Sequence, residues 1–384
     1  MFDPCSFPPE DAVVDAPKRA VDDGAAISCV LDALGFSSFY CEFRRRALEL
    51  GLADVGAAPA QEARTYELFL ERVRQGYCAN LDYVTDAPEK RRDLTSVLPD
   101  VQTVFVATLT EGRLYEESAS ARAALDASTE LISSAADAQD GTIVGYASCL
   151  DYHDLLRKKL QALEAFVRER FPGASTRRAV DTAPILEKDW ARAAGLGFIG
   201  LHSLLVTPDS GSRVFLGELL VSVPFHEATG FADSSAYLAA RARLRELEKK
   251  APFDAEEAEK LCLTCRRCVD ACPTGALRGD RTLDSRRCLN FWTIENRAEI
   301  PEDIARHLAD RLFGCDECQR ACPRNVGVGA AEPTCVPLDA VERLDESAFR
   351  RLFKKTPVFR ATLSGLKRVA AALKGVNEKS PTTE

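Results

Sequence analysis

The chain has 384 residues with a formal net charge of −9, and 46% of its residues are hydrophobic and 28% charged. These values are ordinary for a globular protein, and the length is sufficient for two or three domains. No apolar run approaches the length of a membrane-spanning helix, and the acidic, proline-rich start lacks the pattern of a signal peptide. We therefore expect a cytoplasmic protein with reduced thiols and no membrane partner.

Upstream of residue 226, the hydrophobic pattern predicts alternating helices and strands. The predicted helices cover residues 42–50, 66–74 and 154–170, and the predicted strands cover residues 101–109 and 214–223. Residues 179–184 predict the end of a strand that breaks into a turn, with a helix after it. Such alternation is typical of an α/β or α+β domain.

We divide the chain into five predicted parts. They are an N-terminal extension (1–41), a first domain (42–225), a helical insertion or linker (226–257), a ferredoxin-like domain (258–330) and a basic helical C-terminal region (331–384). Within the last part, residues 350–374 hold eight Lys or Arg and no Asp or Glu. This stretch is either a solvated helical tail or a local positive surface in a chain that is acidic elsewhere.

Eight of the fourteen cysteines lie between residues 262 and 322. Residues 262–273 have the C-x₂-C-x₂-C-x₃-C-P spacing of bacterial ferredoxins, and residues 315–323 repeat it without the first cysteine, for which Cys288 is the replacement. In such motifs three neighbouring thiolates bind one cluster and the fourth reaches the other cluster. The spacing therefore predicts two [4Fe–4S] clusters, one on Cys262, Cys265, Cys268 and Cys322 and the other on Cys272, Cys288, Cys315 and Cys318.

A pair of zinc sites is the main alternative, because C-x₂-C pairs also suit tetrahedral zinc. Zinc has no use for the third cysteine or for the trailing Cys-Pro, and a disulfide set is disfavoured in a reducing compartment. Two clusters imply electron transfer but identify no substrate. The two hundred residues before them need a separate explanation.

Several segments of the first domain resemble the epoxyqueuosine reductase family. They are residues 181–200 (DTAPILEKDWARAAGLGFIG), 211–218 (GSRVFLGE), 51–59 (GLADVGAAP), 91–99 (RRDLTSVLP) and 146–153 (YASCLDYH). The cysteine pattern, including Cys288, agrees with the same family. The likeness extends from about residue 42 to 330 and more weakly to 375.

The resemblance implies a cobalamin-dependent iron–sulfur enzyme that reduces an epoxide on the modified wobble guanosine of tRNA. The predicted first domain would then hold cobalamin without a protein histidine below the cobalt. Residues 151–156 are the nearest match to an Asp-x-His-x-x-Gly cobalamin box, and they lack its glycine. The cofactors implied are thus cobalamin and two [4Fe–4S] clusters.

By the same resemblance, Asp181 is the proton donor, which requires burial to raise the pKa of its carboxyl group. Local sequence alone favours a turn or N-cap residue before Pro184. The residues that the resemblance places around the corrin are Arg91, Asp151, Asp181, Leu205, Leu216, Asn290 and Arg297. Each of them has a structural alternative, and so have His153 and His202, because a lone histidine is more often a satisfied polar group than a ligand.

The implied partners are a tRNA anticodon loop that carries epoxyqueuosine and an electron donor such as a flavodoxin or ferredoxin system. We expect Lys367 and Arg368 to contact the tRNA phosphates. The chain departs from the family at Leu201, where lysine is usual, and at Arg213 and Arg324, where tryptophan is frequent. We expect Leu201 to lie near the RNA. These departures leave open a related reductase of a small molecule, and a non-enzymatic electron carrier is the third possibility.

Overall fold

The first half of the chain is built around a four-stranded sheet in the computed structural model, which describes residues 30–123, 139–251 and 253–379. The strands are β1 (Asp54–Pro59), β2 (Thr103–Thr110), β7 (Val214–Val221) and β4 (Thr176–Ala179), in that spatial order. All three pairs are antiparallel. The sheet therefore belongs to an α+β arrangement, not to a parallel α/β one.

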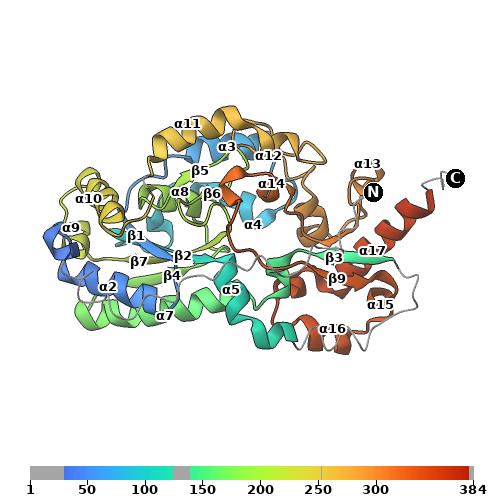
Figure 1. The fold of residues 1–384 in the computed structure, drawn as a ribbon, viewed down its shortest axis with the longest axis horizontal. Helices are drawn as coiled ribbons and strands as arrows, with labels where there is room; N and C mark the ends of the chain where they lie inside the picture. The colour runs from blue at the N-terminus through green and yellow to red at the C-terminus, as the bar shows by residue number, and fades with distance from the viewer. Residues whose placement is uncertain (1–29, 124–138, 252, 380–384) are drawn as a thin grey trace.

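Helices cover both faces of this sheet (Figure 1). Helices α2 (Ser38–Glu49) and α7 (Tyr152–Arg170) pack together on one face, and α8 (Glu187–Ala193) contacts β1, β2 and β7. Asp151 is the N-cap of helix α7, and its carboxylate accepts the His153 N–H. Its apolar positions recur at helical spacing and are buried at Leu156, Leu160, Leu163 and Val167.

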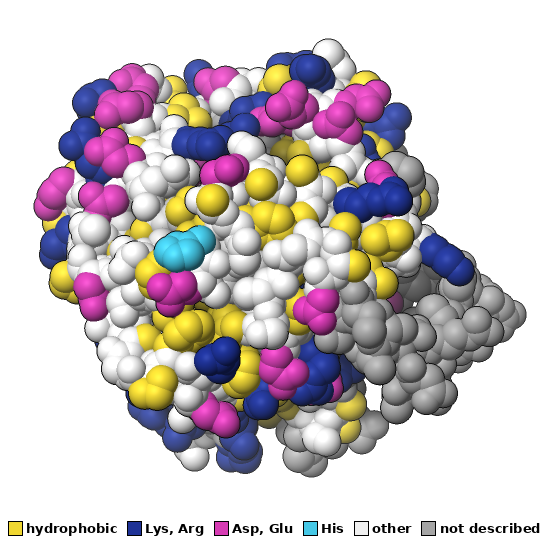
Figure 2. Space-filling view, turned by 90° about the vertical axis from the view of Figure 1, so that its left-hand side faces the viewer, with side chains coloured by type: hydrophobic (Ala, Val, Ile, Leu, Met, Phe, Trp, Pro, Cys, Tyr) yellow, Lys and Arg dark blue, Asp and Glu magenta, His cyan; other side chains and the backbone are white. Residues whose placement is uncertain are grey.

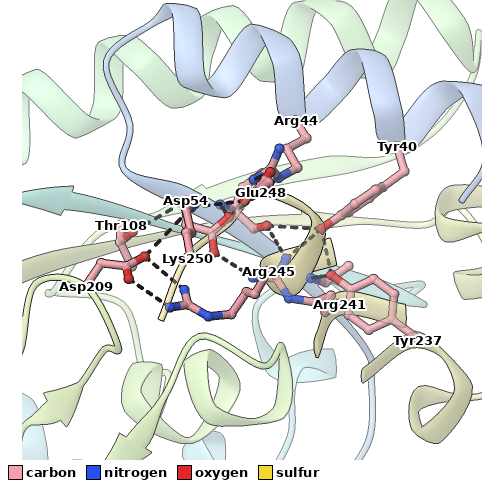
Figure 3. Close-up of polar contacts among 12 residues, drawn as sticks. Tyr40, Arg44, Asp54, Thr108, Asp209, Tyr237, Arg241, Arg245, Glu248 and Lys250 are labelled. Carbon is pink, nitrogen blue, oxygen red and sulfur yellow. Dashed lines mark hydrogen bonds and ion pairs between the residues drawn. The ribbon is translucent and has the colours of Figure 1, made fainter. Parts of the chain in front are cut away.

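The predicted insertion consists of α9 (Phe225–Thr229) and α10 (Ser234–Leu247), and it is tied to the sheet by a buried polar network (Figure 3). Arg241 of α10 donates to Asp54 Oδ2 at 2.6 Å, to the Val55 carbonyl at 2.7 Å and to Tyr40 Oη at 2.9 Å. Arg44 of α2 donates to a Glu248 carboxylate oxygen at 2.7 Å. The insertion therefore packs as part of the first core.

A second, three-stranded sheet joins distant segments of the chain. Strand β3 (Asp140–Ile143) pairs in parallel with β8 (Arg311–Phe313) and antiparallel with β9 (Thr334–Pro337). Residues of the predicted first domain thus pack with the C-terminal region. Helix α17 (Thr362–Lys379) buries Leu366, Val369, Ala370 and Leu373 in the core beside this sheet, so the basic stretch is a packed helix and not a solvated tail.

The cysteine motifs include residues of α11 (Ala255–Cys265), α12 (Arg267–Asp270) and α14 (Glu317–Arg320), and α12 contacts α14. A hairpin of β5 (Phe198–Ile199) and β6 (Leu205–Val206) borders them. The remaining α-helices are α3 (Tyr66–Arg74), α4 (Asp82–Thr85), α5 (Glu111–Glu117), α13 (Glu302–Ala305), α15 (Leu338–Arg343) and α16 (Glu346–Phe353). Short helical turns are η1 (Pro88–Arg91), η2 (Leu94–Ser96), η3 (Gly145–Ser148), η4 (Phe291–Glu295), η5 (Pro323–Asn325) and η6 (Pro357–Ala361).

Charge is mixed on the end of the molecule where α9 and α10 lie. Basic and acidic side chains are interspersed on this face, with hydrophobic side chains between them (Figure 2). A polyanion would therefore find no continuous positive surface on this face. Within the described part of the chain, no helix combines the length and the apolar character needed to cross a membrane.

Candidate active site and iron–sulfur centres

The first predicted cysteine set surrounds one cavity. Cys262, Cys265, Cys268 and Cys322 line a cavity of about 210 Å³, together with apolar residues of the β5–β6 hairpin. Burial and then the charges of Cys262 and Cys322 raise the pKa of Cys268 to about 11. Four neighbouring thiols around one cavity fit an iron cluster, because bound metal supplies the positive charge that deprotonates its thiol ligands.

The second predicted set lines a larger cavity of about 350 Å³, formed by Cys272, Cys288, Cys315 and Cys318 on one side. Burial and then the charges of Cys315 and Cys272 raise the pKa of Cys288 to about 11. The structure thus brings together the two cysteine sets that the spacing indicated, each mixing the two motifs. Which cysteines ligate which cluster stays a prediction.

Asp181 lies opposite the second cysteine set, on the wall of the same cavity. It follows β4 and adopts a left-handed backbone conformation with φ of 57°, which is strained for a residue with a Cβ atom. The Asp181 N–H donates to a Glu187 carboxylate oxygen. Arg91 donates to the carbonyls of Ala183 and Ile185 in the same loop. These bonds hold the Asp181 carboxylate at the cavity.

The Asp181 carboxylate is part of a network of charged side chains. Its Oδ2 lies 3.2 Å from His153 Nε2 and 3.5 Å from an Arg360 nitrogen, and His153 Nδ1 lies 2.7 Å from Asp151 Oδ1. Burial opposes charge on the His153 ring, but the hydrogen bonds to Asp151 and Asp181 raise its pKa to about 9. His153 is therefore an imidazolium at neutral pH, and it is not the neutral structural histidine of the alternative interpretation.

The expectation of a raised pKa for Asp181 is wrong. Burial by itself would raise the pKa of this carboxyl group. The hydrogen bond and charge of His153, with the charges of Arg360 and Lys188, outweigh burial and lower the pKa below its ordinary value. Asp181 is thus ionised at neutral pH, and the proton of the pair resides on His153.

A second group of ionisable residues near Asp181 was not predicted. Glu187 accepts the Asp181 N–H and is hydrogen-bonded to Glu218. Burial and then the negative charge of Asp181 raise the pKa of Glu187 to about 7. Burial and then Glu187 raise the pKa of Glu218 well above its ordinary value. Burial also lowers the pKa of Lys188 to about 8. A glutamate inside the apolar run of residues 214–221 was the available sequence signal.

Four residues predicted to border the corrin line the cavity: Asp181, Leu205, Leu216 and Asn290. The Asn290 Oδ1 atom is buried and has no hydrogen-bond partner among the described residues, as expected of an acceptor that serves a bound group. The apolar Leu205 and Leu216, together with the free Asn290 acceptor, have the chemistry that a cobalamin would need in this cavity.

The other three predicted corrin residues have structural positions that explain them. Arg91 clamps the Asp181 loop from the neighbouring cavity, and Asp151 caps α7 and orients His153. Arg297 donates to the carbonyls of Ile294 and Asn296 and to that of Arg360. None of the three lines the larger cavity.

Lys367 and Arg368, the two residues predicted to contact tRNA, have different surroundings. Arg368 is committed to the carbonyls of Ala298, Trp292 and Asn296, which leaves its guanidinium little capacity for a phosphate. Lys367 is half-buried on the same helix. Leu201 is 1% exposed and packs against Cys268 and Leu277 beside the cluster cavities, so its side chain is not available for a direct contact with RNA, and its proximity to the RNA stays a prediction.

The two arginines that depart from the family have clear positions. Arg213 Nη1 lies 2.8 Å from a Glu111 carboxylate oxygen and 4.0 Å from Asp316 at the larger cavity. Arg324 is exposed at the smaller cavity.

Comparisons with known proteins match both the cysteine-rich part of the chain and part of the predicted first domain. The family model for the 4Fe-4S double cluster binding domain matches residues 261–325, and that for Epoxyqueuosine reductase QueG, DUF1730, matches residues 91–182. The first match decides between zinc and iron–sulfur clusters in favour of the clusters.

Whole-chain comparisons agree. An epoxyqueuosine reductase of Gloeobacter violaceus is 32% identical over 355 residues, which cover 88% of this chain and 97% of that protein. The structure of epoxyqueuosine reductase from Streptococcus thermophilus matches with a TM-score of 0.69 at 23% identity, covering 88% of this chain and 81% of that one. A structure of epoxyqueuosine reductase with a tRNA-Tyr epoxyqueuosine-modified stem loop gives 0.68 at 23%, covering 86% and 80%. The two structures bear on the fold, and the sequence identity bears on descent: the chain belongs to the epoxyqueuosine reductase family.

Proposed function

We propose that the protein reduces the epoxide of epoxyqueuosine in tRNA to the alkene of queuosine. The observation that carries this proposal is the 32% identity over 97% of the length of a curated reductase. Epoxide, two electrons and two protons give alkene and water, so the chain must provide an electron path, a binding cavity and a proton source. The larger cavity offers a candidate for each of these needs.

Electrons would enter at the cluster proposed for the smaller cavity and pass to the cluster proposed for the larger one. Cys265 is exposed, and the neighbouring Leu261 side chain is 59% exposed, so the cluster proposed there is accessible to a partner protein. Arg266 and Arg324 at the same rim favour an acidic partner, such as a flavodoxin or ferredoxin. The second cluster, on the wall shared with Asp181, would pass electrons on one at a time.

Cobalamin is the cofactor that we assign to the larger cavity. Leu205 and Leu216 supply apolar wall for the corrin, and the free Asn290 Oδ1 can accept a hydrogen bond from one of its amides. When bound, reduced cobalamin supplies a low-potential cobalt centre at the substrate. His153 is held by two carboxylates and is therefore not free to ligate a metal.

The Asp181–His153 pair is the proposed proton source. Because the two groups are hydrogen-bonded and both face partners of opposite charge, they titrate as a unit. The proton is held on the His153 imidazolium, and the Asp181 carboxylate at the cavity would accept it from Nε2 and pass it to the epoxide oxygen. The raised pKa of His153 keeps the pair loaded at neutral pH.

The nucleic-acid partner is proposed by analogy with the relative that binds a modified tRNA stem loop. Unpaired anticodon bases can enter a cavity without melting a duplex. Lys367 stays our candidate for a phosphate contact, whereas the bonding of Arg368 argues that it supports the fold. Binding should weaken as salt rises, because phosphate contacts release counterions.

Deleting the gene tests the proposal in the organism. We expect digested tRNA from the deletion strain to contain epoxyqueuosine in place of queuosine, and complementation with the wild-type chain to reverse this. Normal queuosine in the deletion strain would reject the proposed reaction. Reduction of a small-molecule epoxide with no effect on tRNA would instead support the small-molecule alternative.

A further inference from the structure

His202 lies between the two cluster cavities and lines both of them. It belongs to the β5–β6 hairpin, and the whole residue is 4% exposed. Its Nδ1 atom accepts the N–H of Leu204 at 3.2 Å. A nitrogen that accepts a hydrogen bond carries a lone pair, so the ring is neutral and its proton is on Nε2.

The Nε2–H of His202 has no acceptor among the described residues, although the atom is buried. Leaving a buried donor without a partner is unfavourable, so buried donors nearly always have an acceptor. The sequence expectation of a satisfied histidine therefore holds for one nitrogen and fails for the other. Both cavities that His202 lines are also lined by the predicted cluster cysteines, Cys262, Cys265, Cys268 and Cys322 in one and Cys272, Cys288, Cys315 and Cys318 in the other. Sulfur is thus the acceptor that the surroundings offer.

We propose that His202 Nε2–H donates a hydrogen bond to a sulfur atom of one of the two [4Fe–4S] clusters and raises the reduction potential of that cluster. Reduction adds negative charge to the cluster sulfurs, so a donor that points at them stabilises the reduced form. Because it lies between the clusters, His202 would adjust the driving force for electron transfer from one to the other. This inference rests on the double-cluster domain and not on the identity of the substrate.

The test is an anaerobic redox titration of the full-length, cluster-loaded protein, followed by EPR spectroscopy. We expect His202→Leu to move the midpoint potential of one cluster to a more negative value and to leave the other unchanged. A tenfold weaker reduction equilibrium corresponds to about 59 mV for one electron. His202→Asn, which keeps an N–H donor, should fall between wild type and His202→Leu, and His226→Leu is the matched control because His226 is exposed.

A second measurement uses the wild-type protein and does not depend on how the variants fold. With ¹⁵N-labelled histidine, pulsed EPR of the reduced clusters should reveal a weak coupling to a histidine nitrogen. Midpoint potentials that match wild type in a fully loaded His202→Leu protein would overturn the proposal. Coupling of the His202 nitrogen to cobalt in the cobalamin-loaded protein, with none to a cluster, would also overturn it.

Discussion

Asp151 offers the sharpest perturbation of the proposed proton source. Replacing Asp151 by Asn removes one of the two carboxylates that hold the charge on His153. Asparagine is as good an N-cap as aspartate, so α7 should keep its first turn. The variant therefore changes the charge at His153 and little else. Asp154→Asn is the matched control, because Asp154 lies in the same first turn but pairs with Arg157.

The size of the effect follows from the pKa of His153. A rise from 6.5 to about 9 corresponds to roughly 3 kcal/mol of preference for the imidazolium. If Asp151 provides half of this, its loss weakens proton binding about tenfold and brings the pKa to about 8. Because the folded-state pKa is raised, the stabilisation is complete below about pH 6.5 and disappears as pH rises through about 9.

The assay is an NMR titration of the ring protons in histidine-labelled protein, which has only four histidines. We expect Asp151→Asn to lower the His153 midpoint by about one pH unit and Asp154→Asn to leave it within a few tenths. The upper limb of the pH–rate profile should move with the midpoint. A His153 midpoint that is equal in Asp151→Asn and wild type, or that moves as far in Asp154→Asn, would refute the reasoning.

Three further predictions concern the site and the fold. Asp181→Asn should lower turnover by a factor on the order of 10²–10⁴ while cluster and cobalamin spectra persist; wild-type turnover would remove Asp181 from proton delivery. Cys265→Ser and Cys318→Ser should each lose half of the iron, and only Cys318→Ser should perturb bound cobalamin, because Cys318 lines the larger cavity; equal perturbation by both would contradict the assignment. Arg241→Ala should cost about 3–5 kcal/mol of unfolding free energy, because it leaves the Asp54 carboxylate without its closest cation. Adding Asp54→Asn should recover part of that loss in chemical denaturation, and a purely additive loss would indicate that the ion pair is not coupled.

Local patterns predicted the individual elements well. Residues 66–74 form a helix with the predicted bounds, and the predicted helix over 154–170 begins two residues earlier, at Tyr152, directly after its Asp151 cap. The strands over 101–109 and 214–223 are present with shifts of one or two residues at their ends. Helical and strand periodicity depend on near neighbours, so a sequence shows them directly.

Long-range pairing was beyond such patterns. Strand β3 has only four residues and finds both of its partners more than 160 residues away. Nothing in its local sequence specifies them. The same is true of the bond between α10 and β1, because Arg241 and Asp54 are each ordinary charged residues until the fold brings them together.

The candidate site shows where residue types suffice and where they do not. Cysteine spacing identified the two sulfur sets, because thiolates have few other reasons to repeat at these intervals. The protonation state of Asp181 was missed, because it is set by His153, 28 residues away, and by Arg360 on η6. Arg91, Arg297 and Arg368 looked available from sequence, but each is occupied by backbone carbonyls.

The most direct measurement of the central claim is a reconstituted reaction. The protein, purified without oxygen and loaded with iron, sulfide and cobalamin, is mixed with reduced flavodoxin and tRNA that carries epoxyqueuosine, and the digested tRNA is analysed by mass spectrometry. We predict queuosine, formed with the consumption of two electrons per nucleoside, and none from the Asp181→Asn protein within the same time. Unchanged epoxyqueuosine with a fully loaded wild-type protein would contradict the account.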